Sequence, residues 1–447
     1  MTLSLSILFT EKPSKNDKFS TTYITISPKK DGLTAKTKCI NPQTPSFLPL
    51  KRKLKVSSNF TSIFPKLRML NSPLRDRSNT LWIDVPLLTL PNELISYIVF
   101  FLDYSAIQRL SQTCRRIRSI CHDDADLWRR LLQTDFRTAH PFPRHHYRNR
   151  LTLERRWQTG KVTTRFLQGH EDSVYCSAWI GKHLLVTGSR DQAIKIWDVR
   201  TGECQQTIKQ HDGSVLCMRV FDRWLMTGSS DATCILWSLP TIEPRLRLRG
   251  HGHSILDVCW VSGKIVTSSK DHTLRVWDGQ TGDELRQLLG HTASVNALDT
   301  VHHNQVVSAS GDTTVKWWDV ESGNCLKTFV GHELGLACVR FDGTFLYSGG
   351  LDGKIIVWDI ETGSRLHSLT GHGKMIRSID CLEGKLVSGS YDRTLKVWDP
   401  KTGDCILSFQ SAQSSSIYNV LLSNTHIVSS GQDKQIMVLD FVTGLDI

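Results

Sequence analysis

Histidine, a serine or threonine hydroxyl and aspartate recur together along the second half of this chain, and these are the side chains of a general-base catalytic triad. Each hydroxyl residue stands four positions before an aspartate, in the pairs Thr187/Asp191, Thr227/Asp231, Thr267/Asp271, Ser308/Asp312, Ser348/Asp352, Ser388/Asp392 and Ser429/Asp433. Six of the repeats open with a histidine: His170, His211, His251, His291, His332 and His372. A catalytic constellation has no reason to recur in every repeat. We therefore interpret the set as a structural network, in which the histidine, the hydroxyl and an indole N–H donate hydrogen bonds to a buried aspartate.

Each repeat also ends in the same way, six residues after the aspartate. The endings are Trp197-Asp198, Trp237-Ser238, Trp277-Asp278, Trp318-Asp319, Trp358-Asp359, Trp398-Asp399 and a degenerate Leu439-Asp440, spaced 40 or 41 residues apart. A period of this length that closes on Trp-Asp is typical of the WD40 β-propeller. The sequence therefore predicts an all-β, seven-bladed propeller over residues 161–447.

The seventh repeat lacks both the Gly-His pair and the tryptophan, so it needs support from elsewhere in the chain. Residues 162–167 alternate like a strand but belong to no blade of their own. We expect this segment to pair beside Ile436–Asp440 and so to close the ring, because an exposed final edge strand would invite aggregation.

The net charge of +12 is concentrated at the N-terminus. Residues 1–80 contain 15 Lys/Arg against four acidic residues, which leaves the remainder nearly neutral. This composition, without apolar periodicity, favours a disordered basic tail over residues 1–85. The cluster Lys51-Arg52-Lys53-Leu54-Lys55 would suit a nuclear import signal or nucleic-acid contact, and a solvated run of charge is an equal alternative.

Several functional classes have no support in the chain. No apolar run reaches the ~18 residues of a membrane span. We expect no secretory signal, because the mildly apolar residues 3–9 have no basic region before them and no cleavage-like site after them. None of the 12 cysteines forms a CxxC pair, which favours reduced thiols in the cytoplasm or nucleus. There is no nucleophile elbow, metal-spaced His/Cys cluster or phosphate loop, so neither a cofactor nor a catalytic site is expected.

Between the tail and the first blade the hydrophobic period becomes helical. Pro91 suits a first helical turn, Asp103 suits a helix cap, and residues 123–126 are rich in aspartate that can open a further helix. The apolar residues at helical spacing are Leu94, Ile98, Phe101 and Leu102, then Ala106, Leu110, Cys114 and Ile117, then Leu127, Trp128 and Leu131. The pattern predicts three short helices in residues 86–136. A helical linker over residues 137–160 follows, with its clearest helix between Tyr147 and Trp157.

Residues 90–136 resemble an F-box. The resemblance lies in Leu-Pro-x-Glu-Leu from Leu90, in Leu102-Asp103, in Leu110 with Cys114-Arg115, and in Leu127-Trp128. F-boxes dock on the Skp adaptor of cullin–RING ubiquitin ligases. The resemblance implies adaptor contacts by Leu90, Pro91, Leu94, Ile98, Leu110 and Trp128.

Two positions in each blade are expected to face outward around the central channel. The residue before the aspartate gives Arg190, Ser230, Lys270, Gly311, Leu351, Tyr391 and Gln432. The residue five after the histidine gives Tyr175, Leu216, Leu256, Asn296, Ala337, Arg377 and, by pattern, Tyr418. We call these fourteen residues the rim. Its cations favour an anionic ligand, since an arginine fork binds phosphate or carboxylate bidentately.

Residues 160–447 resemble the β-transducin-repeat-containing (β-TrCP) type of F-box protein. The matching stretches include Val174-Tyr175-Cys176, Ser189-Arg190-Asp191, Ser269-Lys270-Asp271 and Tyr391-Asp392. The resemblance implies that Arg190 and Arg377 grip phosphates of a degron. It assigns Lys270, Tyr175, Asn296, Gly311, Ala337 and Tyr391 to the same pocket. Two positions depart from that family, because Ser416 aligns with its third phosphate-binding arginine and Leu351 replaces a small hydroxyl residue.

The sequence thus predicts a non-catalytic substrate receptor of an SCF-type ubiquitin ligase. Its expected partners are the Skp-type adaptor, through it the cullin and RING subunits, and phosphorylated or acidic protein segments. One alternative is a WD40 scaffold without ligase association. A chromatin or RNA binder that uses the basic tail is another, and an enzyme is the weakest, because every candidate catalytic group belongs to the repeat.

Overall fold

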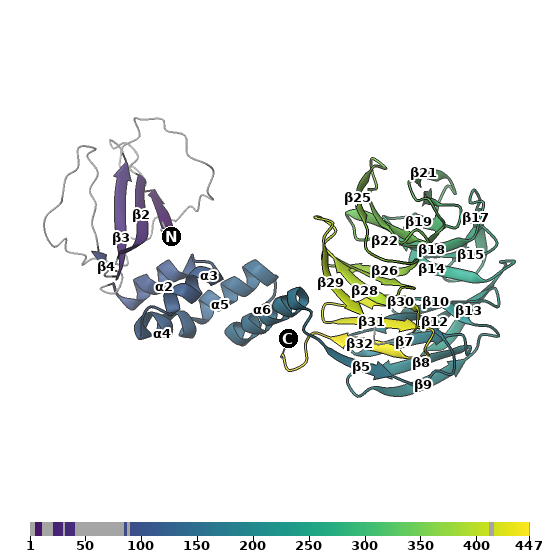
Figure 1. The fold of residues 1–447 in the computed structure, drawn as a ribbon, viewed down its shortest axis with the longest axis horizontal. Coiled ribbons are helices and arrows are strands. Elements are labelled where there is room, and N and C mark those ends of the chain that lie inside the picture. Colours follow the sequence, from purple (N-terminus) through teal and green to yellow (C-terminus); the bar gives the residue numbers. More distant parts are fainter. Residues whose placement is uncertain are drawn as a thin grey trace. The chain divides into compact units, whose positions relative to one another are not determined.

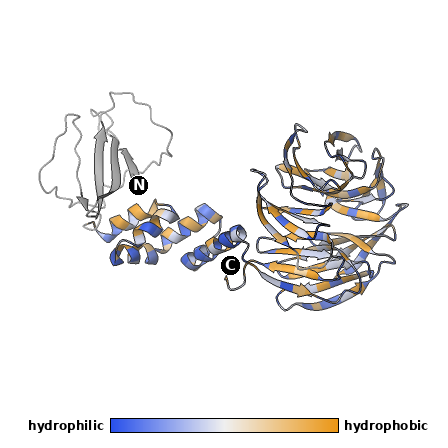
Figure 2. Ribbon diagram, in the orientation of Figure 1, coloured by the Kyte–Doolittle hydropathy of each residue, from blue (hydrophilic) through white to orange (hydrophobic). Residues whose placement is uncertain are grey.

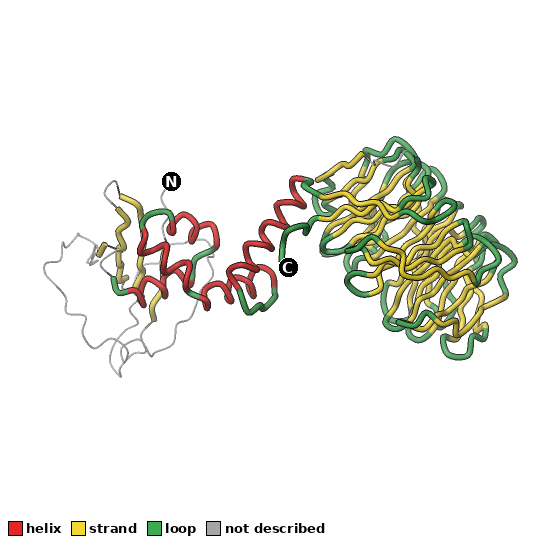
Figure 3. The backbone as a smooth tube through the Cα atoms, turned by 90° about the horizontal axis from the view of Figure 1, so that it is seen from below, coloured by secondary structure: helices red, strands yellow, loops and turns green. Residues whose placement is uncertain are grey.

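The computed structural model describes residues 90–410 and 415–446, together with the backbone of four short strands nearer the N-terminus. The chain divides into two compact units, Met1–Arg148 and Asn149–Ile447 (Figure 1). Helices dominate the described part of the first unit after residue 90, and strands dominate the second (Figure 3).

The four N-terminal strands form one antiparallel sheet in the order β1-β2-β3-β4. They are β1 (Leu5–Thr10), β2 (Thr21–Lys29), β3 (Gly32–Ile40) and β4 (Val85–Pro86). The composition of this region predicts a disordered tail, and the structure differs from that prediction over these strands. Threonine, isoleucine and tyrosine, which favour strands, are frequent in β2. The rest of the predicted tail, including the cluster at residues 51–55, lies outside the described residues.

The helical region contains four α-helices where the sequence predicts three. They are α2 (Asn92–Phe100), α3 (Tyr104–Ser111), α4 (Arg115–Asp123) and α5 (Ala125–Leu131), followed by the π-helical turn η2 (Leu132–Phe136). The second predicted helix is divided because Cys114 adopts an extended conformation and caps α4. Two predicted caps are confirmed. Asp103 accepts a hydrogen bond from the backbone N–H of Ala106 at 2.7 Å, and Asp124 accepts from the N–H of Leu127 at 3.0 Å.

The buried side of α2 differs from the predicted apolar stripe. Ile95 and Val99 are fully buried, whereas Leu94 and Ile98 are only half-buried. The core of this region also contains Ile107, Ile117, Cys121, Leu127, Trp128, Leu131 and Leu132. Helix α2 is therefore apolar on two sides, and one of them remains partly open to solvent.

The predicted linker helix is present as α6 (Pro143–Thr159). It ends where predicted, because Gly160 adopts φ +70° and donates its N–H to the carbonyl of Arg156 at 2.8 Å. In the first unit, the hydroxyl of Tyr147 donates to Asp135 at 2.5 Å. In the second unit, the indole of Trp157 stacks on Phe441 with ring centroids 3.7 Å apart.

The second unit is a ring of seven four-stranded antiparallel sheets, as predicted. The first three blades contain β6 (Val174–Ile180), β7 (Leu184–Ser189), β8 (Ala193–Asp198) and β9 (Glu203–Lys209); β10 (Val215–Phe221), β11 (Trp224–Ser229), β12 (Thr233–Ser238) and β13 (Glu243–Arg249); and β14 (Ile255–Val261), β15 (Lys264–Ser269), β16 (Leu274–Asp278) and β17 (Glu284–Leu288). Blades four to six contain β18 (Val295–Thr300), β19 (Gln305–Ser310), β20 (Thr314–Asp319) and β21 (Cys325–Val330); β22 (Leu336–Phe341), β23 (Phe345–Gly350), β24 (Ile355–Asp359) and β25 (Arg365–Leu369); and β26 (Ile376–Leu382), β27 (Lys385–Ser390), β28 (Thr394–Trp398) and β29 (Cys405–Gln410). The first strand of each blade lies innermost.

The seventh blade confirms the predicted ring closure. It combines β30 (Ile417–Leu422), β31 (His426–Gly431) and β32 (Ile436–Asp440) with β5 (Thr163–Leu167) from the start of the propeller. Strand β5 pairs antiparallel with β32, and Leu167 lies opposite Ile436. Leu167 is only 1% exposed and packs among the apolar residues between the seventh and first blades.

Apolar residues from neighbouring blades pack into clusters around the ring, and hydrophobic and hydrophilic residues alternate along many strands (Figure 2). Within the described part of the chain, no helix has both the length and the apolar character needed to cross a membrane. The eleven cysteines that the structure describes are all free thiols.

Candidate binding site on the propeller rim

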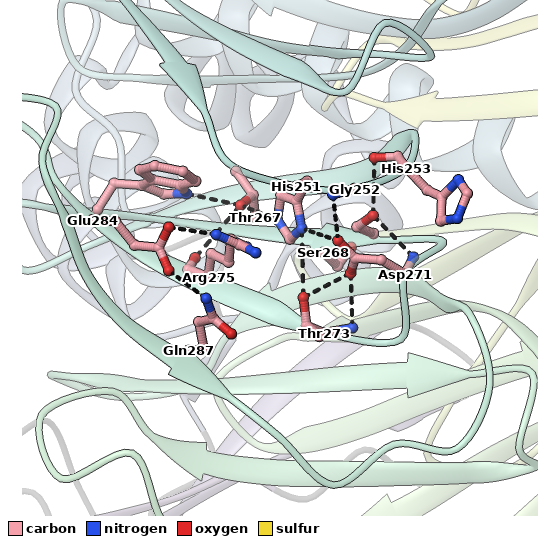
Figure 4. A network of polar contacts seen from close by, with 12 residues as sticks. His251, Gly252, His253, Thr267, Ser268, Asp271, Thr273, Arg275, Glu284 and Gln287 are labelled. Carbon is pink, nitrogen blue, oxygen red and sulfur yellow. Dashed lines mark hydrogen bonds and ion pairs between the residues drawn. The ribbon is translucent and has the colours of Figure 1, made fainter.

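The triad-like residues form the same hydrogen-bonded chain in the first six blades. In the third blade, Nδ1 of His251 lies 2.8 Å from Oδ2 of Asp271, and its Nε2 lies 2.8 Å from Oγ1 of Thr267 (Figure 4). The indole N–H of Trp277 donates to that same Oγ1 at 2.9 Å. Asp271 therefore accepts a hydrogen bond from the histidine, whereas the Thr267 hydroxyl and the indole meet each other and do not reach the aspartate; the prediction that all three donate to it is wrong for these two.

These hydrogen bonds engage both ring nitrogens of His251, and the Thr267 hydroxyl that Nε2 meets also accepts the buried indole N–H of Trp277. Burial lowers the pKa of His251, and the same cause lowers the pKa values of His291, His332 and His372. A neutral imidazole can donate from Nδ1 to the carboxylate and accept at Nε2 from the Thr267 hydroxyl, which is fully buried. The network thus holds the loop at the start of each repeat against the blade.

The seventh blade keeps the aspartate and the hydroxyl but has neither the histidine nor the tryptophan of the others. Burial raises the pKa of Asp433, in contrast to Asp271, whose pKa falls to about 2 because hydrogen bonds from Thr273 and His251 outweigh its burial. The closing strand β5 and the stacked pair Trp157 and Phe441 support this blade instead.

Three tyrosines gather at the mouth of the central channel. The ring of Tyr418 stacks on Tyr175 with centroids 5.3 Å apart and meets Tyr391 at 5.6 Å. Burial raises the pKa of Tyr418, and the positive charges of Arg377 and Arg190 oppose that rise. Both arginines therefore lie near the tyrosine cluster, although they come from the sixth and first blades.

Neither Arg190 nor Arg377 is held by a short ion pair among the described residues. The side chain of Arg190 is 62% exposed, and its ion pair with Asp172 is long, at 3.8 Å. Such a surface pair contributes little energy, so a stronger anion can displace it. Among the described residues Arg377 forms no ion pair.

The remaining predicted residues differ in their surroundings. Asn296 lies beside Gly311 and donates its side-chain N–H to the carbonyl of Leu336 at 2.6 Å. Ala337 is buried and lines the cavity of the central channel. Lys270 is exposed, and within the described residues its side chain makes no ion pair or hydrogen bond. Four members of the predicted set, Tyr175, Asn296, Ala337 and Arg377, line the same cavity of the central channel.

A charged cluster deeper in the channel escaped the sequence analysis. Arg219 contacts Asp299 at 3.1 Å and Asp257 at 3.6 Å, and Arg340 contacts Asp380 at 3.4 Å. Burial works against the charge of Arg219, but Asp257 and Asp299 outweigh it and raise its pKa. The repeat alignment contains a signal for this cluster. Four of its residues stand three positions after a rim residue of the same strand: Arg219, Asp299, Arg340 and Asp380.

The same carboxylates join neighbouring blades. Asp257 accepts the N–H of Leu298, Asp299 accepts that of Phe341, and Asp380 accepts that of Leu422, all at 2.7–2.8 Å. The cavity that remains is about 70 Å³. This is far below the ~300 Å³ of a typical small-molecule pocket, so the channel is filled and only its mouth offers a binding surface.

Comparison with known proteins agrees with this architecture. The model described as "WD domain, G-beta repeat" matches six times, over residues 161–198, 202–238, 242–278, 282–319, 323–359 and 363–399. The model described as "F-box-like" matches residues 87–134. The chain belongs to the WD-repeat family and carries an F-box-like domain.

Several curated proteins are similar to parts of this F-box/WD-repeat chain. "F-box/WD repeat-containing protein 7" of Drosophila melanogaster is 31% identical over 145 residues, which is 28% of this chain and 11% of that protein. "Probable E3 ubiquitin ligase complex SCF subunit sconB" of Talaromyces marneffei is 32% identical over 98 residues, 22% of this chain and 14% of that protein. "Nuclear distribution protein nudF 1" of the same fungus is 50% identical over 52 residues, 11% of each. The chain therefore matches only 11–14% of the length of these relatives.

The residues predicted to contact an adaptor differ in exposure within the F-box-like domain. Pro91 is exposed, and Leu90, Leu94, Ile98 and Leu110 are half-buried. Trp128 is only 4% exposed and donates its indole N–H to the carbonyl of Cys121 at 2.9 Å. In this chain Trp128 therefore serves the core of the domain, and the other five offer the accessible apolar surface.

Proposed function

We propose that this chain is a substrate receptor of an SCF-type ubiquitin ligase and has no catalytic role of its own. The observation that carries the proposal is the F-box-like domain directly before a WD-repeat propeller whose rim gathers cations and tyrosines. Relatives that are named as F-box/WD-repeat protein and as SCF subunit support it.

In this proposal the F-box-like domain docks a Skp-type adaptor and, through it, the cullin and RING subunits. The half-open side of α2 supports that role, because Leu94 and Ile98 leave apolar surface exposed while Ile95 and Val99 fill the core. A core built from such short helices is thin, so a partner surface would add stability.

The rim would capture a phosphorylated or acidic segment of the substrate. Each phosphate adds roughly −1.5 to −2 charge and strong hydrogen-bond acceptors, which suit Arg190 and Arg377. The receptor then contributes proximity, because it raises the effective concentration of a substrate lysine near the conjugating enzyme. The cytoplasm and the nucleus are the compartments in which we propose that it acts.

The test is complex formation on a sizing column between the purified chain, a recombinant Skp adaptor and cullin. The Leu90→Asp/Pro91→Ala variant should lose the complex, because it places a charge and removes a ring on the exposed side of the domain. Gln133→Ala, which alters an exposed residue of η2, should keep it. Circular dichroism must show that every variant is folded. If the wild-type chain forms no complex, a WD40 scaffold is the better reading.

A further inference from the structure

The rim is chemically divided around the ring, although the blades that build it are alike. Consider the two rim positions of a blade together with the residue two after its histidine. In the sixth blade these three positions carry Lys374, Arg377 and Tyr391. The same three positions of the fifth blade carry Leu334, Ala337 and Leu351. In the fourth blade they carry Ala293, Asn296 and Gly311. Cations and tyrosines thus occupy one side of the channel mouth, and apolar or small residues occupy another.

Leu334 and Leu351 lie beside two glycines, Gly335 and Gly311, which have no side chains. The N–H of Leu351 donates to the carbonyl of Gly335 at 3.0 Å, which ties the two loops of the fifth blade together. A Cβ atom on Gly335 would lie 3.0 Å from the carbonyl oxygen of Gly311 and 3.2 Å from Cδ1 of Leu351. The backbones of the fourth and fifth blades therefore meet directly beneath the two leucines. We call Leu334, Leu351, Gly311 and Gly335 the apolar ledge.

The apolar ledge is open to solvent. Leu351 is 53% exposed and Leu334 is 50% exposed. A single exposed leucine on a surface needs no explanation, but here two lie in connected loops at the mouth of the channel. Of the charges next to the two leucines in the chain, Glu333 is paired with Lys354 at 3.3 Å, and Asp352 is bound to His332 in the buried network. Among the described rim residues, this sector offers apolar contact and no free cation.

We propose that the apolar ledge binds one apolar side chain of the same protein segment whose phosphorylated or acidic residue meets Arg377 and Arg190. The inference rests on the proposed function and adds a second chemical requirement to the substrate. Because the two kinds of surface share one channel mouth, an extended segment that crosses the mouth meets both. The receptor then selects for an acidic group and an apolar residue at one fixed spacing.

The experiment measures binding of fluorescent synthetic peptides to the full chain by anisotropy. Each peptide carries a phosphoserine between two aspartates and a single leucine, whose position is moved along the peptide. A matched series has serine in place of that leucine. The variants are Leu351→Ser and Leu334→Ser, with Leu366→Ser as control, because Leu366 is 42% exposed but lies on the outer strand β25.

At one spacing, the leucine peptide should bind the wild-type chain about tenfold more tightly than the serine peptide, as expected for burial of part of a leucine side chain. Leu351→Ser and Leu334→Ser should each bring the affinity for the leucine peptide close to that for the serine peptide. Circular dichroism must show that both variants are folded. Leu366→Ser should behave like the wild type.

Two results would overturn the inference. If binding requires the phosphate but leucine and serine peptides bind equally at every spacing, the apolar ledge does not contribute to peptide binding, and the proposed function still stands. If no peptide binds the folded wild-type chain, the rim captures no acidic segment, and the inference fails together with the proposed rim function.

Discussion

A single hydroxyl in each of the first six blades joins the histidine and the tryptophan of the hydrogen-bond network. In the second blade, Oγ1 of Thr227 lies 2.9 Å from Nε2 of His211 and accepts the indole N–H of Trp237 at 2.9 Å. Thr227 is fully buried, so no water can replace it. The hydroxyl therefore satisfies two buried groups at once, and its loss should cost more than one ordinary hydrogen bond.

Thr227→Val keeps the shape of the side chain and removes the hydroxyl. We expect it to lower the free energy of unfolding by about 2–4 kcal/mol, since two buried polar groups lose their partner. Thr207→Val is the matched control, because that hydroxyl is exposed and its partners, Lys195 at 2.9 Å and the thiol of Cys204 at 3.7 Å, can turn to water instead. Urea unfolding followed by tryptophan fluorescence measures both. Equal effects of the two substitutions would show that the network does not stabilise the blade.

At the residue level, much of the site could be predicted because the repeat places equivalent positions in equivalent environments. Alignment alone assigned Arg190 and Arg377 to one face, and the structure places both near Tyr418. The role of Trp128 could not be settled this way, because an apolar residue in a short helix suits either the core or a partner. The ion pairs of Arg219 depend on the distances between the inner strands of three blades. The spacing of residues along the sequence gives no information on these distances.

The closing strand β5 is the element on which the ring depends. Leu167→Ala should destabilise the propeller by about 2–4 kcal/mol, because it leaves a cavity in the core between the seventh and first blades. Phe166→Ala is the neighbouring control, since Phe166 points to the other face and is 39% exposed. Chemical denaturation compares the two variants. If Phe166→Ala were the more harmful, β5 would be packed in the opposite register.

Element boundaries followed the sequence well where the hydrophobic period was strict and poorly where it was not. The β5 pairing was predictable from two observations. Residues 162–167 alternate like a strand but belong to no blade, and the seventh blade lacks an outer strand of its own. The break between α3 and α4 was not, because Ala106, Leu110 and Ile117 keep helical spacing across it. Residues 112–114 separate the two helices, and the extended backbone of Cys114 starts α4.

At the scale of the whole propeller, six copies of one network make stability dependent on pH. Burial lowers the pKa values of four network histidines below their ordinary 6.5, so the unfolded chain binds protons more readily as the pH falls below that value. The pKa values of Asp271, Asp312 and Asp392, at about 2, add a second loss as the pH falls below 3.8.

The midpoint of urea unfolding should therefore be lower at pH 5 than at pH 7. Measurements in about 1 M salt separate this effect from repulsion among the surplus positive charges, because the screening length there is only ~3 Å. A midpoint that stayed constant or rose toward pH 5 would contradict the neutral, buried state of the histidines.

The two units of the molecule have separate tasks in the proposed function, but both must belong to one chain. Arg190→Glu/Arg377→Glu should abolish phosphopeptide binding and keep the adaptor, whereas Leu90→Asp/Pro91→Ala should do the reverse. The readout is ubiquitin transfer to a lysine-containing phosphopeptide that the rim binds, in a reaction with adaptor, cullin, RING subunit and conjugating enzyme. An equal mixture of the two variants should remain inactive, because proximity cannot be shared between separate chains. Activity in the mixture would show either that chains associate and share their units or that the substrate binds outside the rim.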